Sequence, residues 1–210
     1  MARSTGQRAG LSRRQVLDAA HHLLAERGLD GLTIRSLAER LDVVPTAVYR
    51  WVDNKAALLD ALIDDTLTAA EVPPDTAAPV EALRGLLVAV FDAICTRPAL
   101  APLYLDRRTS PGPTASAIRE HLERLLRDAG VSPRVAATAT PVLLVHALGF
   151  AAFVQQTDGE PRLLRGAGMG APRETFTRGL DWLITGITTS PRGSARGRTT
   201  HGRPRRGTEA

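Results

Sequence analysis

Apolar residues recur every three or four positions along most of the chain, which is the spacing of amphipathic helices. The clearest example is SRRQVLDAAHHLLAER, residues 12–27. Ser12 and Gln15 have the spacing of a capping box at its start, and Gly28 is placed to end it. Four apolar side chains share one face of this predicted helix: Val16, Ala20, Leu23 and Leu24.

Three further segments follow at the spacing of a helix-turn-helix. Thr33 is placed to cap a short helix, IRSLAERL, and residues 42–52 leave room for a turn and two helical turns. A leucine-rich run comes next, for which Asp53 is the expected cap and Pro73-Pro74 the stop. Its apolar side consists of Leu58, Leu59, Leu62 and Ile63.

The rest of the chain predicts a second group of helices. Helical periodicity recurs at roughly 80–97, 114–129, 133–156 and 173–188. Pro141 lies inside the third stretch, so a kink or break is expected there. The predicted fold is therefore all-α, with an N-terminal three-helix helix-turn-helix domain and a C-terminal helical bundle. The expected bounds are 1–70 for the arm and helix-turn-helix domain, 71–79 for a boundary, 80–189 for the bundle and 190–210 for a disordered basic tail.

The segment VVPTAVYRWVDNK, residues 43–55, has the composition of a strand but the position of a recognition helix. On a helical wheel the inward arc holds Val48, Trp51 and Val52, extended by Val44. The outward arc holds Thr46, Ala47, Tyr49 and Arg50. Pro45 falls in the first turn, where a missing N–H costs no hydrogen bond. An outward face that is small, polar, aromatic and basic suits the major groove of DNA.

Lys55 is the only lysine among 27 basic residues. It falls in the first turn of the predicted leucine-rich helix, where a cation opposes the helix dipole, so local helix stability does not explain it. A phosphate bound at that helix end would use both the free backbone N–H groups and the ammonium. The alternative is a solvated surface lysine.

Composition and charge narrow the class of protein. The chain is 43% hydrophobic but only 4% aromatic, which favours helices, and its single cysteine, Cys95, excludes an intrachain disulfide. The net charge of +5 resides at the ends, because residues 15–189 carry −4. The N-terminal stretch lacks the apolar core of a secretory signal, and the apolar run 141–154 is too short to span a bilayer. We expect no membrane association and a cytoplasmic location.

The run LTIRSLAERLDVVPTAVYRWVDNKAALLDAL resembles the DNA-binding domain of the TetR family of bacterial transcriptional regulators. The shared pattern is G-L-T-x-R-x-L-A at 31–38, V-Y late in the recognition helix, and then N-K-x-x-L-L; the likeness extends over residues 12 to about 65. The resemblance implies a homodimer with a variable helical C-terminal domain that usually binds a small effector. Most members are repressors.

Carried over by position, the resemblance implies that Arg35 reaches base edges and that Tyr49, Trp51 and Lys55 touch the phosphate backbone. The expected DNA-binding set is Thr33, Arg35, Pro45, Thr46, Ala47, Tyr49, Arg50, Trp51 and Lys55. The chain departs from the family pattern at Asp42, where a turn glycine is usual. It also departs at Val44, where a capping serine is usual, and at Val52, where phenylalanine is common.

A ligand pocket is expected between the C-terminal helices. Its candidate residues are Phe91, Tyr104, His121, His146, Phe150, Phe153 and Gln155, for each of which ordinary core or surface is the alternative. No metal or cofactor is expected. Phe153 stands near the position of an acidic metal-binding residue in a tetracycline-binding member, and adjacent His21 and His22 point about 100° apart on a helix. The stretch RGAGMGAP, residues 165–172, is expected to be a loop rather than a nucleotide site.

A dimer interface is expected on the last two helices. Its candidate residues, which could instead pack within the subunit, are Leu143, Leu144, Ala147, Ala151, Leu180, Leu183 and Ile187.

The sequence thus predicts a dimeric, sequence-specific repressor that binds a near-palindromic double-stranded DNA operator and is released by an unidentified small molecule. One alternative is an activator or a regulator without an effector. Another is an all-α small-molecule binding protein or enzyme with a merely structural helix-turn-helix. No catalytic constellation supports an enzyme. The basic tail either adds DNA affinity through counterion release or is a solvated extension.

Overall fold

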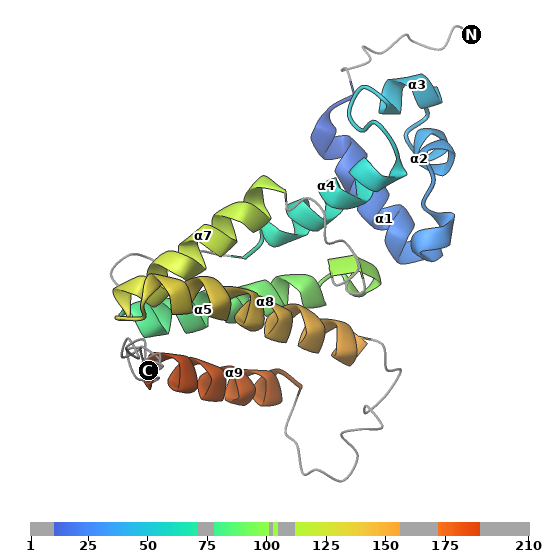
Figure 1. Cartoon of the computed structure of the whole chain (residues 1–210). Helices are drawn as coiled ribbons and strands as arrows, with labels where there is room; N and C mark the ends of the chain where they lie inside the picture. Colours follow the sequence, from blue (N-terminus) through green and yellow to red (C-terminus); the bar gives the residue numbers. More distant parts are fainter. Residues whose placement is uncertain (1–10, 71–77, 101–102, 105–111, 156–171, 190–210) are drawn as a thin grey trace, which may run out of the picture.

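The computed structural model describes residues 11–70, 78–100, 103–104, 112–155 and 172–189. Every regular element in these ranges is helical, so the all-α prediction is confirmed. Figure 1 shows α1–α3 gathered at one end of the molecule, α5, α7, α8 and α9 forming a bundle at the other, and α4 running from the first group towards the second. The predicted arm, Gly-rich loop and tail, and most of the boundary segment, lie outside the described residues.

The N-terminal group consists of α1 (Arg13–Gly31), α2 (Ile34–Arg40), α3 (Pro45–Val48) and α4 (Lys55–Leu67). The predicted capping box of α1 is present, because the backbone N–H of Ser12 donates to Gln15 Oε1 at 2.8 Å and Ser12 Oγ accepts from the Gln15 N–H at 3.3 Å. Thr33 caps α2 as predicted, with its Oγ1 accepting from Ser36 N–H at 3.0 Å. Gly28 interrupts α1 with a φ of 66°, close to the predicted end.

The recognition helix is shorter than the sequence predicted. The regular α-helix ends at Val48, and the next three residues form a turn. The helical wheel misplaces two residues outside this helix: Trp51, placed on the inward arc, is 39% exposed, and Val44, before the helix, is 65% exposed. The predicted cap of α4 is also wrong by one residue, because Asn54 Oδ1, not Asp53, accepts from the Ala57 N–H at 2.9 Å.

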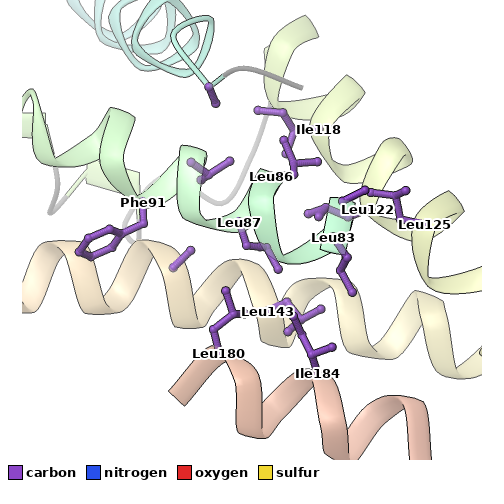
Figure 2. Close-up of a cluster of buried hydrophobic side chains, with 14 of the residues drawn as sticks. Leu83, Leu86, Leu87, Phe91, Ile118, Leu122, Leu125, Leu143, Leu180 and Ile184 are labelled. Atoms are coloured by element: carbon purple, nitrogen blue, oxygen red, sulfur yellow. The ribbon is translucent and has the colours of Figure 1, made fainter. Parts of the chain in front are cut away.

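The bundle consists of α5 (Pro79–Cys95), the 3₁₀ turn η1 (Pro98–Leu100), α7 (Pro113–Asp128), α8 (Pro133–Gln155) and α9 (Pro172–Thr189). Helix α5 lies in the middle and packs against the other three long helices. Figure 2 shows its leucines between the apolar faces of α7, α8 and α9. The labelled core residues are Leu83, Leu86, Leu87, Phe91, Ile118, Leu122, Leu125, Leu143, Leu180 and Ile184.

Helix α8 continues through Pro141, so the break considered from the sequence does not occur. A proline removes the hydrogen bond to the carbonyl four residues earlier. Both Pro141 and Ala137 are exposed, so water can take the place of the missing N–H. By length and composition alone, Pro133–Val154 could cross a membrane, with a mean hydropathy of 1.8. This span is longer than the apolar run 141–154, and one side of it packs in the core through residues such as Leu143, Ala147 and Ala151.

Candidate nucleic-acid interface

A tight turn sets the direction of α3 relative to α2. Asp42 adopts a φ of 53° in this turn. Its N–H donates to the Glu39 carbonyl at 3.3 Å, and the Val43 N–H donates to the Ala38 carbonyl at 3.0 Å. These two bonds form a Schellman motif, which needs a left-handed residue after the helix. The family resemblance leads one to expect glycine here, and aspartate is one of the few other residues that tolerate this conformation.

The inner side of α3 is anchored in the N-terminal core. Val48 is fully buried, and Val52 is buried after it, in the same cluster as Leu37 and Leu58. Packing against α2 and α4 therefore holds this four-residue helix, which is far too short to be stable alone.

The outer side of α3 carries the predicted DNA-binding side chains. Thr46, Tyr49 and Arg50 are exposed, Ala47 is half-buried, and Pro45 occupies the first helical position, so the outward arc is confirmed. Tyr49 is 51% exposed and lies, like Trp51, in the turn after the helix. A threonine, an arginine and two aromatic residues thus lie exposed along one short segment.

Arg35 lies in the first turn of α2, the helix that precedes the turn. Its Nε makes a 3.1 Å ion pair with Glu39 Oε1, and both side chains are largely exposed. Exposed pairs of this kind contribute little stability, so the guanidinium can exchange its carboxylate for a nucleic-acid acceptor at small cost. Thr33, by contrast, is held by its capping role.

Lys55 has a definite partner within the protein. Its Nζ donates a 2.7 Å hydrogen bond to the backbone carbonyl of Leu29, and the residue is half-buried. Leu29 follows Gly28, where α1 loses helical geometry, so its carbonyl is available to a side chain. The lysine is therefore not a freely solvated surface cation. Its phosphate contact stays a prediction.

Two polar contacts join α1 to the other helices of the N-terminal group, one to α2 and one to α4. Arg40 at the end of α2 donates to both oxygens of Glu26 on α1, at 2.6 and 2.7 Å, and these bonds lower the pKa of the Glu26 carboxyl. On the buried side of α1, His21 Nε2 lies 2.9 Å from Asp65 Oδ2 of α4. Both contacts fix α1 relative to a helix that carries or supports the exposed surface.

A cavity of about 420 Å³ lies between α4, α5, α7 and α8. Of the predicted pocket residues whose side chains the structure describes, Tyr104 alone lines it. Its lining residues are Asp60, Ile63, Leu67, Val90, Leu103, Tyr104, Gly112, Ala115, Ile118, Arg119, Pro141, Leu144, Val145 and Leu148. The sequence prediction favoured aromatic and histidine side chains, whereas the cavity is mainly aliphatic. The one sequence signal that points to it is the apolar face of α4, which extends beyond the helix-turn-helix.

The other predicted pocket residues lie elsewhere. Phe91, His146, Phe150 and Phe153 form an aromatic cluster with Phe176 of α9, in which Phe91 and Phe176 stack with ring centroids 4.2 Å apart. His121 is buried on α7, and the side chain of Gln155 lies outside the described residues. Within the described part of the chain, no group of three or more His, Cys, Asp or Glu residues could hold a metal ion.

The likeness to known proteins is strongest in the helix-turn-helix. The family model described as "Bacterial regulatory proteins, tetR family" matches residues 16–62. The class D tetracycline repressor of Escherichia coli is 51% identical over 59 residues, which is 28% of this chain and only 27% of that repressor.

Solved structures extend the likeness over the whole fold. A TetR variant of Acinetobacter baumannii AYE, crystallised in complex with minocycline, is 30% identical with a TM-score of 0.71, over 84% of this chain and 96% of that one. BioQ of Mycobacterium smegmatis is 31% identical with a TM-score of 0.72, over 85% of this chain and 98% of that one. A BioQ bound to its natural double-stranded DNA operator gives a TM-score of 0.67 at 28% identity, over 85% and 98% of the two chains. The chain therefore belongs to the TetR family of bacterial regulatory proteins and is a transcriptional regulator rather than an enzyme.

Proposed function

We propose that this protein is a homodimeric repressor that binds a near-palindromic operator through α2 and α3 and is released by a small molecule. The observation that carries the proposal is the arrangement of α3. Its inner valine is fully buried, while Thr46, Tyr49 and Arg50 are exposed on the other side. Two such helices, one from each subunit, would enter successive major grooves about 34–36 Å apart.

The exposed residues divide by chemistry into two groups. Arg35, Thr46, Ala47 and Arg50 are suited to base edges, because guanidinium groups pair with guanine and methyl groups contact thymine. Tyr49 and Trp51 flank them and are suited to the sugar-phosphate backbone, together with Thr33, Pro45 and Lys55. The second group would orient the protein without reading sequence.

A dimer interface on α8 and α9 is supported by their outer faces. Trp182 of α9 is 72% exposed and Val145 of α8 is 59% exposed, with Val142 of α8 also largely exposed. Contiguous patches of exposed apolar side chains mark association surfaces, and these three residues would contribute to one. Of the interface residues named from the sequence, Leu143, Ala147, Ala151 and Leu180 are fully buried inside the subunit, whereas Leu144, Leu183 and Ile187 are only partly buried and stay candidates.

Release by a small molecule is supported by the cavity. A bundle packed without space would favour a regulator that has no effector, whereas about 420 Å³ is within the range that binds drug-sized molecules. Minocycline is the ligand in the structure of the Acinetobacter baumannii relative, and it does not identify the ligand of this protein. A soluble repressor of this kind acts in the cytoplasm, where the DNA lies.

The proposal is tested by fluorescence anisotropy with DNA flanking the protein's own gene and a random duplex of equal length, over a salt series. We expect binding at least about a thousandfold tighter to one flanking duplex. Arg50→Ala should weaken that binding by about 1–3 kcal/mol and leave binding to the random duplex almost unchanged. Arg127→Ala, at an exposed position on α7, is the matched control and should change neither. Equal, salt-sensitive binding to all duplexes would contradict the proposal.

A further inference from the structure

Building on the proposed regulatory function, we propose that the cavity between α4, α5, α7 and α8 binds an uncharged, largely apolar small molecule that carries a hydrogen-bonding group. The relatives do not fix this chemistry for the present chain. It follows from the walls of the cavity and from the charges beside it.

The walls are mainly aliphatic. Ile63 and Leu67 come from α4, Val90 from α5, Ile118 from α7, and Leu144 and Leu148 from α8. The cavity volume of about 420 Å³ is within the range of small-molecule sites. Burial of apolar surface is the main driving force for a ligand here.

The two charged side chains that line the cavity have opposite signs. They are Asp60 and Arg119, and Arg119 also makes a 3.1 Å ion pair with Glu123. An ionised ligand would lose its hydration in a mainly aliphatic cavity. A neutral ligand avoids that cost.

Tyr104 supplies a polar group inside the cavity. Its hydroxyl makes a side-chain hydrogen bond with Thr66 and lies 3.5 Å from the Ile63 carbonyl. The second contact is long, so a ligand acceptor can replace it. Burial raises the pKa of Tyr104, so the phenol stays protonated and can donate. One hydrogen-bonding group on an otherwise apolar body therefore matches the cavity.

A bound molecule would contact the helix-turn-helix support directly. Asp60, Ile63 and Leu67 lie on one side of α4, the helix that begins at Lys55. The lining also includes Gly112 and Ala115, at the start of α7. A bound ligand would therefore lie between α4 and the bundle. A change in the distance between them would move α4 and, with it, α1–α3.

The experiment compares two dyes of nearly the same shape in fluorescence titrations of the full chain. N-phenyl-1-naphthylamine is uncharged, and 1-anilinonaphthalene-8-sulfonate adds one negative charge to the same ring system. We expect the uncharged dye to bind at least tenfold tighter. Ala115→Leu, which projects into the cavity, should weaken its binding at least tenfold, whereas Ala117→Leu, at an exposed position of α7, should not. Leu148→Phe fills the cavity from α8 and serves if Ala115→Leu does not fold.

Equal or tighter binding of the sulfonate dye would overturn the assignment. Unchanged binding of the uncharged dye to a folded cavity-filling variant would do the same. DNA binding is measured in parallel without dye. If the wild-type protein shows no sequence preference in DNA binding, the repressor proposal is wrong. The dye titrations would still test the proposed ligand chemistry.

Discussion

The carboxylate of Asp64 on α4 caps the N-terminus of α7, because Oδ1 accepts hydrogen bonds from the backbone N–H groups of Thr114 at 2.9 Å and Ala115 at 3.2 Å. Its Oδ2 accepts a third bond from the Thr114 hydroxyl at 2.9 Å. The N-cap residue, Gly112, has no side chain with which to cap the helix itself. A carboxylate here also interacts favourably with the helix dipole. A residue of the helix that supports the DNA-binding surface thus completes a helix of the bundle.

Asp64→Ala should lower the free energy of unfolding by about 1–2 kcal/mol, because loss of a cap leaves backbone donors of α7 without a partner. Urea denaturation measures the change. Asp128→Ala is the matched control, since it removes an exposed carboxylate from the other end of the same helix, where negative charge is not favoured. Equal unfolding free energies for the two variants would show that the cap contributes nothing.

Gly112→Ala should have an effect similar to that of Asp64→Ala. A Cβ at this position would lie 2.3 Å from Asp64 Oδ1 and 2.5 Å from Cγ, so the carboxylate must leave the helix end. The backbone φ of −62° suits any residue, so the cost is steric. The double variant should be much less destabilised than the sum of the single variants. Gly149→Ala, with open space around the added methyl, should instead stabilise α8 by about 0.5–1 kcal/mol. Strict additivity of the first pair would contradict the contact.

Features set by neighbouring residues could be predicted from the sequence, and features set by distant ones could not. The caps at Ser12 and Thr33 depend on side chains three positions apart, and both were predicted correctly. The bond from Thr114 to Asp64 joins positions 50 residues apart, and no periodicity reveals it. The end of α3 was misjudged because the helical wheel assumes a regular helix, whereas the chain turns after Val48.

The candidate site shows the same division. The exposed residues of α3 follow from local amphipathic spacing and were placed correctly. The cavity is made by aliphatic side chains of four helices, which in a sequence look like ordinary core. The sequence predicts Phe91 and Phe150 in a pocket, but in the structure they pack with Phe176.

Asp42→Gly should stabilise the protein by up to about 1 kcal/mol. Asp42 is the non-glycine residue with a positive φ among the described residues, and glycine adopts that conformation without a steric penalty. Gly130, at φ 85°, occupies the equivalent position after α7, with the same pair of hydrogen bonds. Thermal and urea unfolding measure the effect. Asp53→Gly, outside the positive-φ region, is the control and should destabilise; stabilisation of both variants alike would refute the conformational explanation.

The unfolding free energy should fall as the pH falls below about 6.5, partly because of His21. Burial lowers the pKa of His21, and Arg97 adds to the effect, while Asp65 and Asp18 oppose it. The unfolded chain therefore takes up this proton before the folded chain does, which costs at most about 1.4 kcal/mol per pH unit. Urea denaturation between pH 7.5 and 5.5 measures the slope. His21→Gln should flatten it, and His22→Gln, at the exposed neighbour, should not. An unchanged slope in His21→Gln would exclude this group.

Lys55 should contribute to folding as well as to DNA binding, and Lys55→Met separates the two roles. The variant keeps an apolar stem but removes the donor 2.7 Å from the Leu29 carbonyl, so we expect a loss of about 1–2 kcal/mol in unfolding free energy. Lys55→Arg keeps a donor and should lose less. If the ammonium also meets a phosphate, the salt dependence of operator binding should fall by about one counterion in Lys55→Met. A destabilised variant with an unchanged salt slope would assign Lys55 to the joint between α1 and α4 alone. Unchanged stability with a reduced slope would show that the bond to Leu29 contributes nothing to the free protein.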